Sequence, residues 1–558
     1  MAVSRQVGPP ARALGALYGK ALGLPSVRTR YSIRPGIRVP TRDGAELLTD
    51  HYLPERNPRG TVLIRSPYGR GVPLNWTHGR MLAARGYHVL VQSVRGTAGS
   101  TGTFRPIVQE SQDGQDTLAW LREQEWFDGR LATIGGSYLG WAQWALLQDP
   151  PPELRAAVVL VGPHDFQQVM YGTGALALGD LLSWSAMVGA QGDGGLRGLR
   201  ALVAARRRLA AAWAERTSAE AAASVLDGTA ADWFGDWLDH TAADDPFWAG
   251  YRADSALEKA DVPVLLLGGW QDVFLDQTLH QYRTLRRRNP SVALTIGPWT
   301  HRDIAAKAGR VVDPQLVRWL DRHLGGDTAT AEAPVRIYQT GARRWLDLPD
   351  WPPAGTERVL WLQPDGGLGR HAAEGTVGFR YDPADPTPSL GGRHMSAKAG
   401  EVDNRSLERR ADVLTFTTEA LTEPVDVIGE PIVELEFAAD NPHADVFVRL
   451  CDVDSRSRSR VITERFVRLS PAPLEAAKIR LELGACAHRF ATGHRMRLQI
   501  SGGAYPRFAR NPGTDEPGTF VAVAVRIGLA ASTLALPVPG TSAAPSTEGV
   551  PSTMHGDA

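Results

Sequence analysis

The sequence contains very little cysteine. Its 558 residues include only two, Cys451 and Cys486. This number argues against a fold built on several disulfides and against a zinc site made of four cysteines, while one bridge between the two stays open. The composition is otherwise that of an ordinary globular protein, and the length is sufficient for two to four domains.

The chain also lacks an excess of charge, since 61 basic side chains balance 61 acidic ones. Balanced charge gives no general attraction to nucleic acid or anionic membranes, so neither partner is expected. No run of about eighteen apolar residues occurs, which predicts that no helix spans a membrane. Pro9, Pro10 and Lys20 interrupt the basic N-terminal segment, which therefore lacks the apolar stretch of a signal peptide, and we predict a cytoplasmic protein.

Short apolar runs alternate with helical patterns in the first half of the chain, as in an α/β sheet. Nearly every run leads directly into Gly, Pro, Asp, Ser or His. Strands that are buried on both faces and end at a ligand-facing edge have this pattern, so the chemistry is expected beyond the strand ends. The predicted strands lie at residues 62–64, 89–91, 131–134, 158–161, 264–267 and 292–296.

The strand pattern disappears between about residues 166 and 256, where the sequence becomes helical and rich in Ala, Leu and Arg. Such an insertion predicts a helical cap over the edge of the sheet. The run 206–208 (Arg-Arg-Arg) is interpreted as a solvated helix face. Scattered aromatic side chains are expected to form the core of the cap, with a few lining the substrate pocket: Trp184, Trp233, Phe234, Trp237, Phe247 and Trp248.

Alternation with a period of two begins after about residue 355 and predicts an antiparallel β region. The segment "PIVELEF" sets Val433, Leu435 and Phe437 against two glutamates, and "HRMRLQI" follows the same rule. Repeated strands and turns suggest a sandwich of jelly-roll type, a galactose-binding-like domain. We predict a catalytic domain at 1–165 and 256–355, a cap at 166–255, a jelly roll at 356–535 and a disordered tail at 536–558.

Ser137 lies in "ATIGGSYLGWAQW", between a predicted strand and a predicted helix that ends before Pro150. A strand, a tight turn and a helix are the context of a nucleophile elbow, in which a strained serine is presented at the sheet edge. The generic elbow motif has glycine two residues after the serine, whereas here Leu139 holds that position and Gly140 comes third. Ser137 as a plain helix N-cap is the alternative.

A serine nucleophile needs a base, and the base needs a carboxylate to orient it. Both follow in the order expected of an α/β-hydrolase: Asp272 in "GGWQD" and His301 in "IGPWTH", each just after a predicted strand. Rivals for the carboxylate are Asp276 and Asp303. Rivals for the base are His164 and His280, which are interpreted as structural residues.

Two donors are needed to stabilise the oxyanion of an acyl-transfer reaction. The backbone N–H of Tyr138, directly after the serine, is one candidate. The second is expected from the loop "RSPYGRG", where Pro67 has no N–H to give but Tyr68 carries a hydroxyl. A purely structural, packing role for Tyr68 is the alternative.

Together these segments resemble the cocaine esterase (CocE/NonD) and X-Pro dipeptidyl-peptidase family of serine hydrolases. The resemblance extends from "VPTRDGAELLTDHYLP" to the last strands, through "RSPYGRG", "VRGTAGSTGTF", "WFDGRLATIGGSYLGWAQW", "GGWQDVFLDQTL", "GPWTH" and "GHRMRLQIS". The family elbow is G-x-S-Y-x-G, which matches Tyr138 and Gly140. The resemblance implies Ser137 as nucleophile, Asp272 and His301 as its partners, Tyr68 and Tyr138 as oxyanion donors, a helical cap and a C-terminal jelly roll.

The expected activity is hydrolysis of an acyl ester, with a small ester or peptide as substrate and no metal or organic cofactor. An X-Pro dipeptidyl-peptidase, amino-acyl amidase or α-amino acid ester hydrolase with the same triad is the alternative. Such an enzyme needs carboxylates for the substrate ammonium. Asp236, Asp239, Asp244 and Asp245 are candidates, but a cap helix and the loop after it are usually acidic for solubility, and this interpretation is favoured. A carbohydrate- or partner-binding protein is less favoured. A homodimer is a possible assembly.

Overall fold

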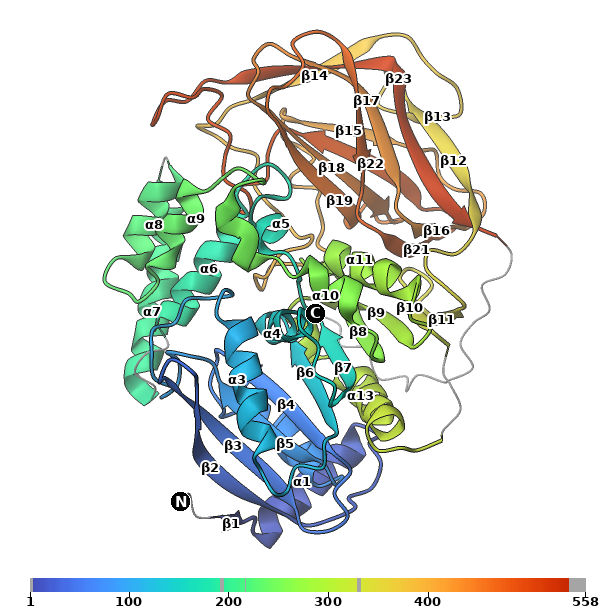
Figure 1. Ribbon diagram of the computed structural model, residues 1–558. Coiled ribbons are helices and arrows are strands. Elements are labelled where there is room, and N and C mark those ends of the chain that lie inside the picture. Colours follow the sequence, from blue (N-terminus) through green and yellow to red (C-terminus); the bar gives the residue numbers. More distant parts are fainter. Residues whose placement is uncertain (1–3, 191–194, 216, 329–332, 541–558) are drawn as a thin grey trace.

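The computed structural model describes residues 4–190, 195–215, 217–328 and 333–540. Figure 1 shows three parts: an α/β unit around one large sheet, a group of helices beside it, and an all-β unit at the opposite end from the N-terminus. The α/β unit is formed by two stretches of chain, and the helical group lies between them in sequence. This arrangement confirms an α/β-hydrolase core with a C-terminal all-β domain.

The large sheet has eleven strands in the order β1-β2-β3-β5-β4-β6-β7-β8-β9-β10-β11. The central strands from β5 to β10 run parallel, and antiparallel pairs occur at both ends. Strands β4, β5 and β8 are buried along their whole length, which is why they appear in the sequence as continuous apolar runs. The strands are β1 (Arg5–Gln6), β2 (Tyr31–Pro40), β3 (Glu46–Pro54), β4 (Thr61–Ser66), β5 (His88–Ser93), β6 (Leu131–Gly136), β7 (Leu154–Leu160), β8 (Val264–Gln271), β9 (Val292–Thr300), β10 (Val335–Gln339) and β11 (Arg344–Leu348).

Helices pack on this sheet and on one another. Helix α4 contacts β4, β6 and β7 and lies between α3 and α10, while α13 contacts β7 and β8. All ten residues of α4 are buried, in agreement with its almost entirely apolar sequence. The helices of this unit are α1 (Pro9–Ala21), η1 (Asn75–Arg80), α2 (Met81–Ala83), α3 (Glu110–Arg122), α4 (Tyr138–Leu147), α10 (Asp254–Lys259), α11 (Leu275–Arg286), α12 (Asp303–Ala306) and α13 (Gly309–His323).

The segment between β7 and α10 is helical, as the sequence predicts. Most of its aromatic side chains form the predicted apolar core, with Phe234, Trp237 and Trp248 no more than 1% exposed. The arginines at 206–208 are exposed, which agrees with their interpretation as a solvated helix face. The elements are α5 (Phe166–Tyr171), α6 (Leu178–Gly189), α7 (Gly195–Ala212), α8 (Ser218–Leu226), α9 (Trp233–Asp239) and η3 (Pro246–Tyr251).

The described part of the C-terminal domain contains three sheets. The first has the strand order β13-β12-β23-β17-β20, with β14 also paired to β23. The second has the order β15-β22-β18-β19, and the third consists of β16 and β21. Val433, Leu435 and Phe437 are fully buried, as their alternation predicts. Its strands are β12 (Gly355–Leu362), β13 (Leu368–Gly369), β14 (Thr376–Tyr381), β15 (Val413–Thr417), β16 (Val425–Gly429), β17 (Ile432–Ala439), β18 (Ala444–Val453), β19 (Ser459–Leu469), β20 (Ala477–Glu482), β21 (Cys486–Phe490), β22 (Arg495–Ser501) and β23 (Val523–Pro539). The jelly-roll and galactose-binding-like descriptions stay predictions.

Two details of the C-terminal part differ from, or complete, the sequence analysis. The predicted tail begins too early at 536, because β23 continues to Pro539, where it pairs with Gly355 at the start of β12. The rest of the tail, 541–558, lies outside the described residues. Cys451 and Cys486 are free and buried, and burial raises the pKa of each thiol to about 12. The bridge left open by the sequence is therefore not formed.

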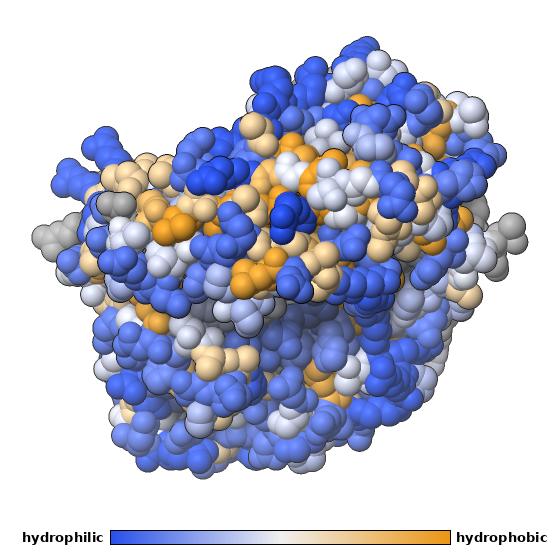
Figure 2. All heavy atoms as spheres, turned by 90° about the horizontal axis from the view of Figure 1, so that it is seen from above, coloured by the Kyte–Doolittle hydropathy of each residue, from blue (hydrophilic) through white to orange (hydrophobic). Residues whose placement is uncertain are grey.

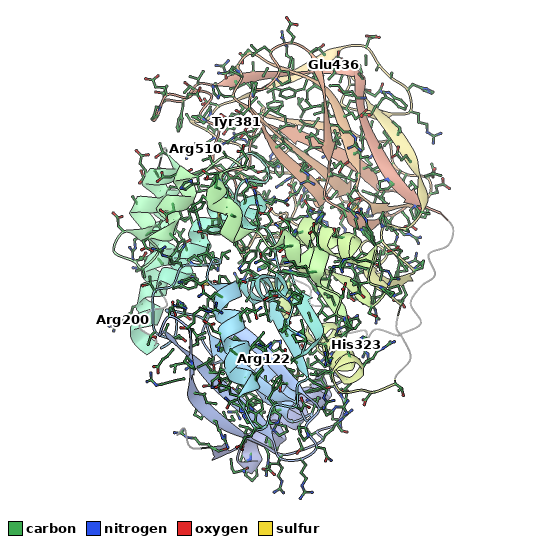
Figure 3. The ribbon with its side chains drawn as sticks, viewed as in Figure 1. Arg122, Arg200, His323, Tyr381, Glu436 and Arg510 are labelled. Atoms are coloured by element: carbon green, nitrogen blue, oxygen red, sulfur yellow. The ribbon has the colours of Figure 1, made fainter. Side chains whose placement is uncertain are left out.

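Contacts join the C-terminal domain to the helical segment between β7 and α10. Figure 3 places Arg510 where the β domain approaches these helices. Its Nη2 donates to the backbone carbonyls of Trp213 at 3.3 Å and Glu215 at 3.1 Å, and Tyr505 donates its hydroxyl to the Trp213 carbonyl at 3.0 Å. Figure 2, which looks down on the β-domain end, shows hydrophilic residues over much of this face with smaller apolar groups between them.

Candidate active site

The topology of the sheet explains why distant loops meet at one place. Strands β4 and β6 are adjacent and parallel, although β5 lies between them in sequence, so the chain leaves the sheet in opposite directions after each of them. The carboxyl ends of parallel strands at such a switch point form a crevice. Tyr68 follows β4, Ser137 follows β6, and Asp272 and His301 follow the neighbouring strands β8 and β9.

Ser137 occupies a tight turn between β6 and α4. Its φ of 57° and ψ of −123° lie in a region that residues with a side chain rarely adopt, as expected of a nucleophile elbow. Gly140 explains the spacing of the motif, because a Cβ there would lie 2.6 Å from the Cα of Gly162. Glycine is thus required three residues after Ser137, where α4 crosses the segment after β7. The helix N-cap alternative lacks support, since Ser137 makes no side-chain capping hydrogen bond.

His301 joins Ser137 to Asp272 by two hydrogen bonds. Its Nε2 lies 3.0 Å from Ser137 Oγ, and its Nδ1 lies 2.6 Å from Asp272 Oδ1. Asp272 is fully buried, and its Oδ2 accepts the backbone N–H of Phe274 at 3.0 Å. The Phe274 ring packs edge-on against the imidazole of His301, with centroids 5.1 Å apart. The three side chains therefore have the geometry in which a serine can transfer its proton to a histidine.

The rival residues have other partners. Asp276 forms ion pairs with Arg393 at 2.9 Å and Arg465 at 3.0 Å, both from the C-terminal domain. Asp303 accepts the hydroxyl of Thr300 at 2.8 Å and pairs with Lys307. His164 and His280 stack on each other, with ring centroids 5.4 Å apart. These contacts explain all four rivals as structural residues.

The C-terminal domain also holds the loop that carries Asp272. Gln271, directly before it, donates its side-chain amide to the carbonyl of Ile462 at 3.0 Å. Asp276, four residues after it, bridges Arg393 and Arg465. Because the β domain contacts the chain on both sides of Asp272, it restricts the position of this carboxylate.

Both predicted oxyanion donors are neighbours of Ser137, Tyr68 in space and Tyr138 in the chain. The Tyr68 hydroxyl is enclosed in the site, which raises its pKa to about 12, against the opposing effects of hydrogen bonds with Trp184 and Ser137. Tyr138 starts α4, so its backbone N–H belongs to the free first turn of the helix. Because the Tyr68 hydroxyl interacts with Ser137, a purely structural packing role does not fully explain Tyr68.

A buried polar network lies beneath these two donors. The Tyr138 hydroxyl donates to Glu110 Oε1 at 2.8 Å and accepts the backbone N–H of Ile107 at 3.0 Å. Glu110 in turn pairs with Arg65 at 3.0 Å, and Arg65 is the third residue before Tyr68 on β4. The network thus connects the strand that leads to Tyr68 with the side chain of Tyr138. Sequence analysis missed it because Glu110 carries no motif that distinguishes it from a surface glutamate.

A cleft of about 1440 Å³ opens over Ser137. Tyr68, Ser137 and His301 supply polar groups at its floor. Apolar side chains form much of the neighbouring wall, among them Leu139, Leu160, Val161, Met187 and Ile304. Charged side chains also line the cleft, among them Arg302, Lys307, Arg310 and Arg318. A mostly apolar lining that carries polar groups suits a small organic substrate.

Asp180 is a further carboxyl group near this site that sequence analysis did not single out. It lies on α6, it is 6% exposed, and its Oδ1 accepts the backbone N–H of Met395 at 2.8 Å. Burial raises its pKa to about 6, although the hydrogen bond from the Met395 N–H and the charges of Arg507 and His301 act to lower it. The four acidic cap residues that were considered for substrate binding are exposed, except Asp245, which is half-buried and bonded to His240 at 2.7 Å.

Neither a metal site nor a membrane-spanning helix is found in the part of the chain that the structure describes. Within residues 4–540, gaps excepted, no cluster of three or more His, Cys, Asp or Glu side chains could hold a metal ion. Across the same described residues, every helix is too short or too polar to cross a bilayer.

Comparison with known proteins gives consistent matches over almost the whole chain. Residues 43–303 match the family "X-Pro dipeptidyl-peptidase (S15 family)", and residues 327–526 match the "X-Pro dipeptidyl-peptidase C-terminal non-catalytic domain". Cocaine esterase of Rhodococcus sp. (strain MB1 Bresler) is 30% identical over 543 residues, which cover 87% of this chain and 93% of that protein.

Solved structures share the fold. An aminopeptidase from a marine sediment Thaumarchaeota archaeon superposes with a TM-score of 0.77 at 23% identity, covering 92% of this chain and 98% of the other. An α-amino acid ester hydrolase gives the same TM-score and coverages at 24% identity. At these levels of identity, both similarities show that the fold is shared.

Proposed function

Because the chain belongs to the serine hydrolase family of cocaine esterase and the X-Pro dipeptidyl-peptidases, we propose that it cleaves carboxylic esters through an acyl-enzyme on Ser137. The observation that supports this proposal most directly is the continuous hydrogen-bonded chain from Ser137 through His301 to Asp272. The strained backbone of Ser137 adds a second, independent indication, because a serine with a merely structural role has no need of it.

His301 acts as the base in the first step. Asp272 is an acceptor when ionised, so Nδ1 of His301 carries the proton that they share and Nε2 is left free to accept. Nε2 removes the proton of Ser137 as Oγ attacks the ester carbonyl carbon. His301 then gives this proton to the leaving alcohol as the C–O bond breaks, and the acyl group stays on Ser137.

Water resolves the acyl-enzyme by the same steps in reverse order. His301 takes a proton from water, the hydroxide attacks the acyl carbon, and the proton returns to Ser137 Oγ as the acid leaves. In both steps the negative oxygen accepts hydrogen bonds from the Tyr68 hydroxyl and the Tyr138 N–H. Donors already directed at this oxygen require no reorganisation as the charge develops.

The test combines activity with labelling. Wild type and Ser137→Ala are incubated with a short-chain p-nitrophenyl ester, with a proline-linked dipeptidyl p-nitroanilide, and with a fluorophosphonate probe. We expect the wild type to cleave the ester and to be labelled at Ser137, and the alanine variant to do neither. Wild-type rates in the alanine variant would refute the assignment of Ser137.

The family match leaves a peptidase or amidase as the second candidate, which the anilide substrate tests. Cleavage of the anilide alone, with a free substrate N-terminus required, would make this chain a dipeptidyl-peptidase with the same triad. The cytoplasmic location, the homodimer and the domain limits given above, apart from the start of the tail, stay predictions. Cell fractionation, size-exclusion chromatography with light scattering, and limited proteolysis test them in turn.

A further inference from the structure

Trp184 connects the cap to both predicted oxyanion donors. It lies in the middle of α6, and its indole Nε1–H donates to the Tyr68 hydroxyl oxygen at 3.0 Å. The same indole stacks on the ring of Tyr138, with centroids 6.0 Å apart and planes inclined by 12°. One cap side chain therefore contacts two residues that reach the site from different strands of the sheet.

The chemistry of these groups fixes the direction of the Tyr68 proton. An indole N–H can donate but has no acceptor to offer, whereas a phenol hydroxyl has one proton and two lone pairs. Because Trp184 donates to the oxygen of Tyr68, the single proton of Tyr68 must point elsewhere. Ser137 is the other side chain that interacts with this hydroxyl, so the proton is left free to point to the side where the reaction takes place.

Neighbouring rings hold Trp184 in place. Trp237 stacks on it with centroids 6.3 Å apart and planes inclined by 27°, and Trp233 lies at the same centroid distance, inclined by 55°. These neighbours have their own polar partners: Trp233 Nε1 donates to Ser185 Oγ and Trp237 Nε1 to the Tyr251 hydroxyl, both at 3.3 Å. The indole of Trp184 is thus part of a packed cluster and has little freedom to turn away.

We propose that Trp184 is a positioning residue of the catalytic site: its N–H orients the Tyr68 hydroxyl so that the phenol proton points at the oxyanion. The cap would then have two roles, to enclose substrate and to complete the oxyanion hole. The inference rests on the proposed function, since it assumes that Tyr68 stabilises an oxyanion. Trp184 takes no part in bond making or breaking.

A double-mutant cycle tests the inference, because it measures whether two side chains act through each other. Trp184→Phe removes the N–H and keeps an aromatic ring over Tyr138, and Tyr68→Phe removes the hydroxyl. We expect Trp184→Phe to lower kcat for the p-nitrophenyl ester about tenfold with KM changed less than twofold. In the Tyr68→Phe background the same substitution should change kcat less than twofold, since no hydroxyl is left to orient.

Inhibitor binding gives a second readout that loss of packing would not move. A boronic acid, which forms an anionic tetrahedral adduct on a serine, should bind Trp184→Phe about tenfold more weakly, whereas the carboxylic acid product should bind as before. Trp213→Phe is the matched control, because this indole of the same helical segment packs against Tyr505, with ring centroids 6.5 Å apart. We expect it to keep kcat within twofold.

Incorporation of 3-benzothienylalanine at position 184 keeps the inference testable if the phenylalanine variant misfolds, because it keeps the two-ring shape and lacks the N–H. An unchanged kcat in a folded position-184 variant, a change in KM alone, or an equal loss in both Tyr68 backgrounds would overturn the inference and leave the proposed function intact. A wild type inactive toward both the ester and the anilide would overturn both.

Discussion

Replacing Ser137 by glycine is expected to give a more stable protein than replacing it by alanine, and both changes should abolish activity. The φ of 57° and ψ of −123° at this position are rare for a residue with a side chain and readily accessible to glycine. The surrounding structure holds this conformation: the N–H of Ser137 donates to the Leu160 carbonyl at 2.9 Å, and its own carbonyl accepts from Gly140 at 2.8 Å. Substitution should therefore leave the turn in place and release its strain.

The size of the effect follows from two opposing contributions. A non-glycine residue in such a region costs about 1–3 kcal/mol. Glycine gives back about 0.5–1 kcal/mol, because it loses more conformational entropy on folding than alanine does. Ser137→Ala is the matched reference, since it also lacks the hydroxyl but keeps the strain. Ser137→Gly should thus be more stable than Ser137→Ala by about 1 kcal/mol.

Urea denaturation of the two variants, followed by tryptophan fluorescence, measures this difference. Because the denaturant dependence of a long chain exceeds the value of about 2 kcal/mol per molar found for small proteins, 1 kcal/mol corresponds to a midpoint that is higher for the glycine variant by at most about 0.5 M. Both variants should lose about 10⁶-fold in kcat for ester hydrolysis. A glycine variant with a midpoint equal to or below that of the alanine variant would refute the argument that Ser137 is strained.

Two other substitutions test the carboxylates. Asp272→Asn should lower kcat by about 10⁴-fold, because the amide favours the wrong tautomer of His301. Asp276→Asn removes a charge from the ion pairs with Arg393 and Arg465 and should lower kcat far less. Equal losses of kcat in steady-state kinetics would contradict the choice of Asp272. Burial raises the pKa of Asp313 from 3.8 to about 7, against the lowering effect of Arg85. The folded chain therefore holds this proton more tightly than the unfolded chain, and the stability of the protein falls as pH rises from about 4 to 7. Asparagine cannot ionise, so Asp313→Asn should stabilise the protein by up to about 4 kcal/mol at pH 8 and by little at pH 4. Denaturation at both pH values checks this, and a gain that is independent of pH would contradict it.

Much of the fold was predictable because burial has a local pattern. Strands β4, β5 and β8 are central and shielded on both faces, so their sequences are continuous apolar runs. In β17 one face is buried and the other is partly exposed, so apolar and charged residues alternate. Such patterns locate an element, but they do not fix where it ends, because pairing with another strand can extend it. Leu536 belongs to β23 because β12 pairs with it, although the residues that follow have the composition of a disordered tail.

The sequence by itself determined the order of Ser137, Asp272 and His301, because each follows an apolar run that ends at the same edge of a parallel sheet. Only the tertiary structure distinguishes Asp272 from Asp276, which are four residues apart in sequence and differ in what they face: His301 in one case, Arg393 and Arg465 in the other. It also distinguished Trp184 from the other cap aromatics. The sequence pattern is the same for any aromatic residue on the buried face of a helix. The contact of Trp184 with Tyr68 depends on how two segments that are 116 residues apart pack in space.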